Sequence, residues 1–342
     1  MPQRLPKPRT GDPALDEAVH DLVALADVSA DVDIVTEMVA TAIKMGRDGH
    51  DRGDLKIVNQ ALRELRNSFR AFGPHRAQRK CSVFGSARTR PDESAYLVAV
   101  ELGRALAERD WMIITGGGPG IMTAAVEGAG RDNSYAVTIR LPFEDMTGGG
   151  IVADDRLVRF RYFFTRKLTF MKESSAYVCL PGGFGTMDET FELLTLIQTG
   201  KEYPSPVVLF DPPGETYWKT WREFVRSELI AAGLASAEDL DLVFLTSSVE
   251  AAADYVHDFY RQFHSMRYVD GRLVIRLVRD ATDDELARLN RDFADIVTNG
   301  VIERTDPLAV ELEDQDEIEL PRIVLCFDNR HFGRLHQLVR AL

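Results

Sequence analysis

The sequence of 342 residues has few of the residues that build disulfide frameworks or metal sites. It contains three cysteines, each inside a short apolar run, and no two of them have the spacing of metal ligands. We therefore expect Cys81, Cys179 and Cys326 to be buried residues of strands. The seven histidines are also scattered without ligand spacing, so no metal is expected.

A long apolar segment is also missing. No stretch approaches the roughly 18 apolar residues that a membrane-spanning helix needs. The first residues, MPQRLPKPRTGDP, have no apolar core of the kind found in secretory signals. These two features predict a cytoplasmic protein.

Basic residues are in deficit. The chain has 41 Lys and Arg against 54 Asp and Glu, which gives a formal net charge of -13. Nucleic acids and anionic membranes bind surfaces with an excess of Lys and Arg, so neither is expected as the main partner. A local basic pocket for one small anion remains compatible with this balance. The 45% of hydrophobic residues is enough for a sizeable core.

The pattern of apolar residues divides the chain into three parts. Helical spacing dominates residues 1–77, which predicts an N-terminal helical arm. Over residues 78–265, short apolar runs alternate with amphipathic segments, which predicts a Rossmann-like parallel sheet with helices on both faces. Residues 266–342 follow the order strand, helix, strand, strand, helix, and predict a small α+β domain that could be ferredoxin-like.

One acidic run lies in this last part, beginning at the predicted strand LAVELE. Its members are Glu311, Glu313, Asp314, Asp316, Glu317 and Glu319. Such a run could mark a metal site, but a solvated hairpin is the favoured interpretation.

Two glycine-rich turns are the strongest chemical signal. Residues 115–120 (TGGGPG) and 181–186 (PGGFGT) each follow an apolar run and open a helix, and Gly85-Ser86 ends the first predicted strand. In a parallel sheet such turns lie where ligands bind. Glycine lets the backbone approach a phosphate closely, and a helix N-terminus supplies free N–H groups. The alternative is that these glycines only make tight turns between strand and helix.

Neither turn has the spacing of a standard nucleotide motif. Residues 116–122 (GGGPGIM) do not place their glycines as G-x-G-x-x-G, and no Gly-Lys-Ser/Thr follows either turn as in a Walker A loop. The phosphate of one mononucleotide is therefore the favoured ligand.

Three motifs together resemble the LOG ("lonely guy") family. Residues 181–189 (PGGFGTMDE) fill the family pattern PGGxGTxxE at every position, and residues 116–122 resemble its GGGxxGxM turn. Arg166 and Lys167 match its Arg-Lys pair. The resemblance covers residues 80–265, approximately, and one departure is Thr123, where family members often have Gly. The parts outside it are similar to those of the larger bacterial members.

The resemblance implies a nucleoside 5'-monophosphate phosphoribohydrolase. Such an enzyme cuts AMP or an N6-substituted AMP of the cytokinin type into the free base and ribose 5-phosphate, without a metal or redox cofactor. It also implies a homodimer or a higher homo-oligomer. Proteins of this type have often been labelled lysine decarboxylases, but no lysine here has a context that indicates pyridoxal phosphate.

The resemblance also assigns roles to residues. Glu189 becomes the catalytic carboxylate, and Arg166 is expected to hold Glu189 and to contact the nucleotide. The residues expected to bind the substrate are Gly85, Ser86, Gly117, Gly118, Met122, Lys167, Gly182, Gly183, Gly185, Thr186 and Thr195.

Each of these assignments has a structural alternative. Thr186-x-x-Glu189 is also the spacing of a helix capping box. Arg166 could lie on the exposed face of an amphipathic helix, and Thr195 could serve packing alone. The whole chain could also be a nucleotide-binding sensor that does not turn its ligand over.

Overall fold

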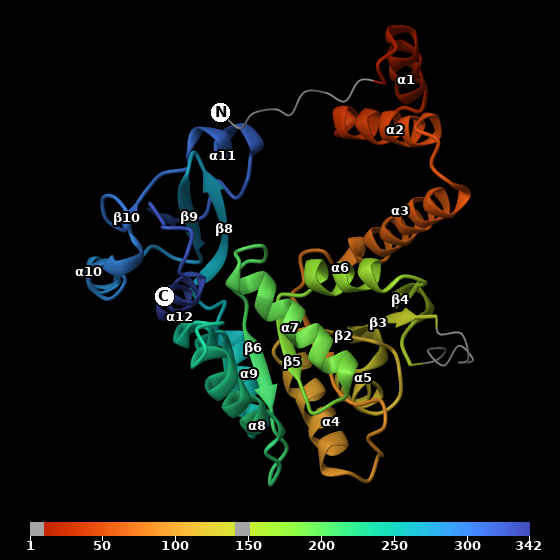
Figure 1. The fold of residues 1–342 in the computed structure, drawn as a ribbon. Helices are drawn as coiled ribbons and strands as arrows, with labels where there is room; N and C mark the ends of the chain where they lie inside the picture. Colours follow the sequence, from red (N-terminus) through yellow and green to blue (C-terminus); the bar gives the residue numbers. More distant parts are fainter. Residues whose placement is uncertain (1–9, 141–150) are drawn as a thin grey trace. The chain divides into compact units, whose positions relative to one another are not determined.

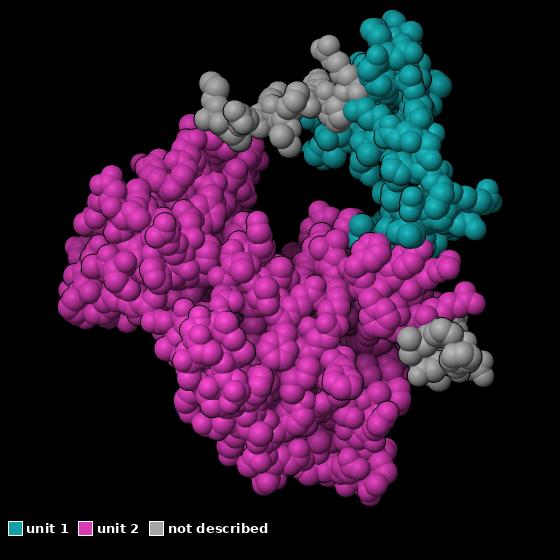
Figure 2. Space-filling model, in the orientation of Figure 1, with its two compact units in different colours: residues 1–66 teal, residues 67–342 magenta. Residues whose placement is uncertain are grey.

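The computed structural model describes residues 10–140 and 151–342, which group into two compact units of residues 1–66 and 67–342 (Figure 2). The first unit is helical, as predicted, with α1 (Pro13–Leu25), α2 (Val32–Arg47) and most of α3 (Arg52–Phe72). The Asp12 side chain caps α1 by accepting from the N–H groups of Ala14 and Leu15. Pro13 follows at the first helical position, where its missing N–H costs nothing.

A seven-stranded parallel sheet forms the centre of the second unit, with strand order β4-β3-β2-β1-β5-β6-β7 (Figure 1). The strands are β1 (Lys80–Phe84), β2 (Met112–Thr115), β3 (Ser134–Ile139), β4 (Leu157–Phe160), β5 (Ala176–Cys179), β6 (Val207–Phe210) and β7 (Val243–Thr246). Because β1 pairs with both β2 and β5, the order of the chain reverses at β1. The predicted Rossmann-like sheet is confirmed, and its reversal lies beside the expected site.

Helices cover both faces of this sheet. One apolar core packs the sheet against α4 (Ser94–Ala107), α5 (Ile121–Ala129) and α9 (Val249–Asp258). The opposite core packs it against α6 (Phe163–Glu173), α7 (Phe184–Gln198), α8 (Tyr217–Phe224) and the end of α3. Strand neighbours alternate between the cores, so Val178 faces the first and Cys179 the second. The strands therefore read as continuous apolar runs, as strands buried on both faces do.

The C-terminal part contains an antiparallel sheet with strand order β10-β11-β9-β8. Its strands are β8 (Phe263–Val269), β9 (Arg272–Leu277), β10 (Glu303–Arg304) and β11 (Arg322–Leu325), and its helices are α10 (Asp283–Asp292), α11 (Ala309–Asp314) and α12 (Phe332–Ala341). The predicted α+β character is confirmed. The chain order β8-β9-α10-β10-α11-β11-α12 is not the β-α-β-β-α-β order of a ferredoxin-like fold.

The two sheets are joined by packing within one compact unit. A Cβ on Gly200, just after α7, would lie 2.2 Å from the Phe332 ring, so α12 rests directly on this turn. His336 of α12 is buried and makes a hydrogen bond to the Ser205 carbonyl at 3.2 Å. The division at 265/266 falls inside β8, and the three domains of residues 1–77, 78–265 and 266–342 stay a proposal.

Two local predictions for the C-terminal part are wrong. The segment LAVELE, predicted as a strand, forms helix α11. Cys326 lies just beyond β11 and is half-buried, whereas Cys81 and Cys179 are buried in their strands as expected.

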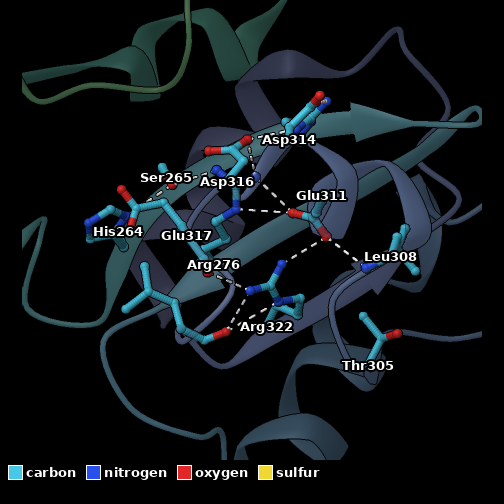
Figure 3. A network of polar contacts seen from close by, with 12 residues as sticks. His264, Ser265, Arg276, Thr305, Leu308, Glu311, Asp314, Asp316, Glu317 and Arg322 are labelled. Carbon is cyan, nitrogen blue, oxygen red and sulfur yellow. Dashed lines mark hydrogen bonds and ion pairs between the residues drawn. The ribbon is translucent and has the colours of Figure 1, made fainter. Parts of the chain in front are cut away.

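The acidic run is a helix and loop and not a hairpin, and two of its members, Glu311 and Asp316, form an ion network with arginines of the sheet (Figure 3). The other four members are exposed, as the solvated interpretation expects: Glu313, Asp314, Glu317 and Glu319. Arg276 of β9 and Arg322 of β11 lie opposite each other in the sheet, where like charges repel. Glu311 is fully buried between them, 2.7 Å from Arg276 Nη2 and 2.8 Å from Arg322 Nη1. Asp316 adds a contact of 2.6 Å to Arg276. Glu311 and Asp316 therefore neutralise the two buried arginines.

We predict that Glu311→Gln lowers the free energy of unfolding by about 3–5 kcal/mol, because Arg322 then remains buried without a carboxylate and Arg276 keeps only Asp316. The matched control is Asp314→Asn, whose side chain is 54% exposed beside Arg267 and whose loss should cost about 1 kcal/mol or less. Urea unfolding of both variants measures the difference. Equal losses would contradict the role given to Glu311.

Candidate active site

Three turns meet at the carboxyl ends of the adjacent strands β2, β1 and β5. Ser86, after β1, donates its N–H to the Pro181 carbonyl at 3.1 Å and accepts from Ile121 N–H at 3.1 Å. The turn after β1 is therefore bonded to both glycine-rich turns. The structure brings Gly85, Ser86 and the two predicted phosphate turns to one edge of the sheet, beside the reversal at β1.

The turn after β2 needs glycine for the conformation of its backbone. Gly117 and Gly120 have φ angles of 71° and 68°, in the left-handed region. A Cβ on Gly120 would lie 2.3 Å from the Ser86 carbonyl oxygen. The side chain of Met122 folds back under this turn, so a Cβ on Gly118 would lie 2.7 Å from its Cε atom.

The turn after β5 leads into α7 with two glycines that packing does not explain. A Cβ on Gly183 or on Gly185 would meet nothing within 4 Å, and neither residue has a positive φ. Gly182 differs, because its Cβ would lie 2.1 Å from Thr186 Oγ1. Open space beside the first N–H groups of a helix suits the close approach of an anion.

The capping-box alternative for Thr186 and Glu189 is excluded. The residue at the N-cap of α7 is Gly183, which makes no side-chain capping hydrogen bond. Thr186 is buried in the first turn, and its carbonyl accepts from the Thr190 hydroxyl at 2.8 Å. Glu189 lies one further turn along the helix, so it is free for another role.

Glu189 is a buried carboxylate with incomplete hydrogen bonding. Its side chain is 8% exposed, and Oε2 is buried without a hydrogen-bond partner. The nearest cation is Lys167 Nζ, 3.9 Å from Oε2. Burial raises the pKa of Glu189 to about 7, against the opposing effect of Lys167 and Arg166. A buried acid with an oxygen that lacks a hydrogen bond and with a raised pKa is a frequent mark of catalytic sites.

Lys167 is held by acids of α7. Its Nζ lies 2.6 Å from Glu192 and 2.9 Å from Asp188, both closer than Glu189. Burial alone would lower the pKa of Lys167, but these two hydrogen bonds raise it, so Lys167 stays charged. The expected contact of Lys167 with the substrate therefore competes with three carboxylates.

Arg166 crosses from α6 to the turn after β2. Its Nε donates to the Val137 carbonyl at 2.9 Å, its guanidinium lies 5.3 Å from the centre of the Phe170 ring, and a Cβ on Gly116 would lie 2.6 Å from its Nη2. Burial lowers the pKa of Arg166, and the charge of Glu189 acts in the opposite direction. Within residues 10–140 and 151–342 no carboxylate lies within 4.0 Å of the Arg166 guanidinium. The expectation that Arg166 holds Glu189 is therefore not met by an ion pair.

Thr195 is the one predicted residue that stands apart from this cluster. It lies six residues beyond Glu189 on α7, which is about 9 Å along the helix axis. Its side chain is exposed, and its hydroxyl donates to the Phe191 carbonyl at 2.7 Å.

Tyr217 is a contributor that the sequence did not indicate. Its hydroxyl, at the start of α8, donates to the Gly182 carbonyl at 2.6 Å. A trans peptide points its C=O and N–H in opposite directions, so this bond directs the Gly183 N–H away from Tyr217. The start of α8 is fixed in turn by buried Asp211, which accepts from the N–H groups of Trp218 and Lys219. Only the fold joins these segments, so no local pattern could have revealed them.

The fold and these turns define a parallel α/β protein with two glycine-rich turns at the carboxyl ends of its strands. The chain matches the family described as "Possible lysine decarboxylase" over residues 110–256. It is 33% identical over 144 residues to the cytokinin riboside 5'-monophosphate phosphoribohydrolase LOG of Oryza sativa, which covers 41% of this chain and 57% of that protein. It is 31% identical over 153 residues to LOG3 of Arabidopsis thaliana, which carries the same activity name, covering 43% and 67%.

The chain belongs to the LOG family. It spans less than three fifths of the length of the Oryza sativa relative. The solved molybdenum cofactor carrier protein of Chlamydomonas reinhardtii aligns with 52% of this chain and 96% of its own, at a TM-score of 0.37 and 23% identity, a likeness too low to carry an argument.

The described part of the chain contains neither a membrane-spanning helix nor a metal-binding cluster. No helix there is both long enough and apolar enough to cross a membrane. No group of three or more His, Cys, Asp or Glu residues in that part could hold a metal ion.

We predict that Glu189→Gln stabilises the protein at high pH. A folded pKa of about 7 against the ordinary value of 4.5 costs the ionised form about 3 kcal/mol. Because the folded pKa is raised, this cost is absent below pH 4.5 and complete above pH 7. Unfolding free energies at pH 4.5 and 8 should therefore coincide for wild type and variant at the lower pH and diverge at the higher one.

The control for this measurement is Glu192→Gln, which removes a half-buried acid from the same helix. It should show no gain in stability at pH 8. A gain for Glu192→Gln as large as that for Glu189→Gln would contradict the assignment of the raised pKa to Glu189.

Proposed function

We propose that this protein hydrolyses the N-glycosidic bond of a nucleoside 5'-monophosphate to a free base and ribose 5-phosphate. The observation that carries the proposal is the buried carboxylate of Glu189, with one unpartnered oxygen, one turn from an open, glycine-lined helix N-terminus. Both features lie within residues 110–256, which match the family model, and relatives of the chain carry this activity in their names.

The phosphate is placed at the start of α7. Gly183 and Gly185 leave space beside the backbone, and the free N–H groups and dipole of the helix favour an anion there. Ser86 and Gly117 lie in the turns after β1 and β2, at the same edge of the sheet. The 5'-phosphate thus fixes one end of the nucleotide, and the ribose is directed along the first turns of α7 toward Glu189.

Cleavage of the glycosidic bond develops positive charge on the ribose ring. The Glu189 carboxylate stabilises this charge and accepts a proton from the attacking water. The oxygen of that water bonds to the anomeric carbon, the bond to the base breaks with its electron pair, and the base takes up a proton. Arg166, beside Gly116 and free of a carboxylate partner in the described chain, contacts the nucleotide.

Substrate identity follows the relatives, so AMP and N6-substituted AMP are the proposed substrates. A panel of nucleoside monophosphates that includes isopentenyl-AMP, assayed for free base and ribose 5-phosphate, tests the reaction and the base preference together.

We predict that Glu189→Gln lowers turnover by about 10²–10⁴-fold, the usual contribution of a positioned acid or base, while nucleotide affinity is largely retained. Wild-type activity should rise with pH through about 7, because the ionised carboxylate is the active form. Glu192→Gln serves as the control and should keep most of the activity.

Two results would contradict the catalytic assignment. Full activity of Glu189→Gln would remove Glu189 from the mechanism. Nucleotide binding without product from any substrate, in wild type as well, would favour a sensor in which the core binds a nucleotide without turnover.

We also propose a homodimer that forms through α6 and α7. Large apolar side chains are exposed on these helices: Phe163, Phe164, Leu168, Phe184 and Phe191. The two helices are neighbours, since Lys167 of α6 contacts Asp188 and Glu192 of α7, and exposed apolar side chains on neighbouring helices can form an interaction surface. Light scattering should give the mass of two chains for wild type and of one chain for Phe164→Glu. Leu97→Glu, at a similarly exposed position on α4, should stay dimeric. A monomeric wild type would contradict the proposal.

A further inference from the structure

A cavity of about 390 Å³ lies in the C-terminal part, built from four separate segments. Arg261 comes from the turn after α9, Arg279 from the end of β9, Arg288 from α10 and Arg340 from α12. Glu285 is the one acidic side chain in its lining. None of these residues belongs to the three turns or to α7, so the cavity is separate from the candidate active site.

Three of the four arginines in this cavity make no ion pair within the described residues, and Ala341 and Leu342 of the chain end complete its lining. Glu285 is used by Arg279, at 2.6 Å. Within the described residues no carboxylate lies within 4.0 Å of the side chains of Arg261, Arg288 or Arg340. Three guanidinium groups around one small cavity repel one another. In a chain with a net charge of -13, this is a local reversal of sign.

Neutral groups hold two of these arginines in place. Arg288 Nη2 donates to the Ala341 carbonyl at 2.6 Å, and the Arg340 guanidinium lies 5.0 Å from the centre of the Tyr255 ring. The buried side chain of Gln262 donates to the Arg279 carbonyl at 2.8 Å, which ties the residues next to Arg261 to those at Arg279. The guanidinium groups of Arg288 and Arg340 are thus oriented by neutral partners.

We infer that this cavity binds a small molecule that carries a diphosphate or triphosphate group. Guanidinium groups bind phosphate oxygens in pairs, and three of them match the several charges of such a group. A volume of about 390 Å³ suits a small ligand and is too small for a macromolecular surface.

The test is calorimetric titration of the full chain with inorganic triphosphate as the probe. Saturating ribose 5-phosphate is included, because the proposed function makes it a product that occupies the candidate active site, which leaves the arginine cavity to the probe. Wild type should bind one triphosphate per chain. Arg261→Ala should weaken this binding by about tenfold, the loss of one charge-assisted contact. This variant removes no hydrogen bond within the described structure, so it should fold normally.

Arg288→Lys refines the test, because it keeps the charge but removes the planar pair of donors, and it should also weaken binding. The matched control is Arg291→Ala, on the same helix, whose side chain is 71% exposed and pairs with Asp292. It should bind as wild type does. Absence of triphosphate binding to wild type, or equal binding by wild type and Arg261→Ala, would overturn the inference without bearing on the nucleosidase reaction.

Discussion

The candidate site depends on the backbone of Ser86. This residue stands where the order of the sheet reverses, and its two hydrogen bonds join the turn after β1 to the turns after β5 and β2. The spacing of the two glycine-rich turns is therefore set by main-chain groups. Gly120 shows how tight this junction is, because a Cβ there would collide with the Ser86 carbonyl oxygen. In the proposed phosphate site, this junction fixes the positions of the backbone N–H groups.

Glu189 and Arg166 are both buried beside these turns, and burial disfavours the charged form of each side chain. Burial raises the pKa of Glu189 to about 7. The Lys167 ammonium, whose charge favours the ionised form of Glu189, also contacts Asp188 and Glu192. The buried Glu189 carboxylate destabilises the folded state above pH 7, and the two apolar cores of the sheet offset that cost. The apolar cores on the two faces of the sheet therefore stabilise the fold, and the candidate site lies at the carboxyl ends of its strands.

Local sequence patterns correctly predicted those elements whose tertiary surroundings match their own apolar or polar pattern. The strands of the parallel sheet are apolar on both faces and could be recognised directly. The segment LAVELE alternates like a strand, yet it forms α11, because Glu311 turns inward between Arg276 and Arg322. The charges that draw it in belong to strands that are distant in sequence. Tyr217 was missed for the same reason, since its partner Gly182 lies 35 residues earlier.

The sequence by itself determined the family, the parallel sheet, and the placing of Gly183, Gly185 and Glu189 near one helix start. Those features are local, since a glycine turn and a motif of nine residues act through their own backbone. Only the tertiary structure decided that Thr186 and Glu189 form no capping box, that Lys167 and not Arg166 lies closest to Glu189, and that Thr195 stands apart. The tertiary structure also brought four arginines from separate segments together around one cavity. These depend on distances between side chains of different elements, which exist only once the elements have packed.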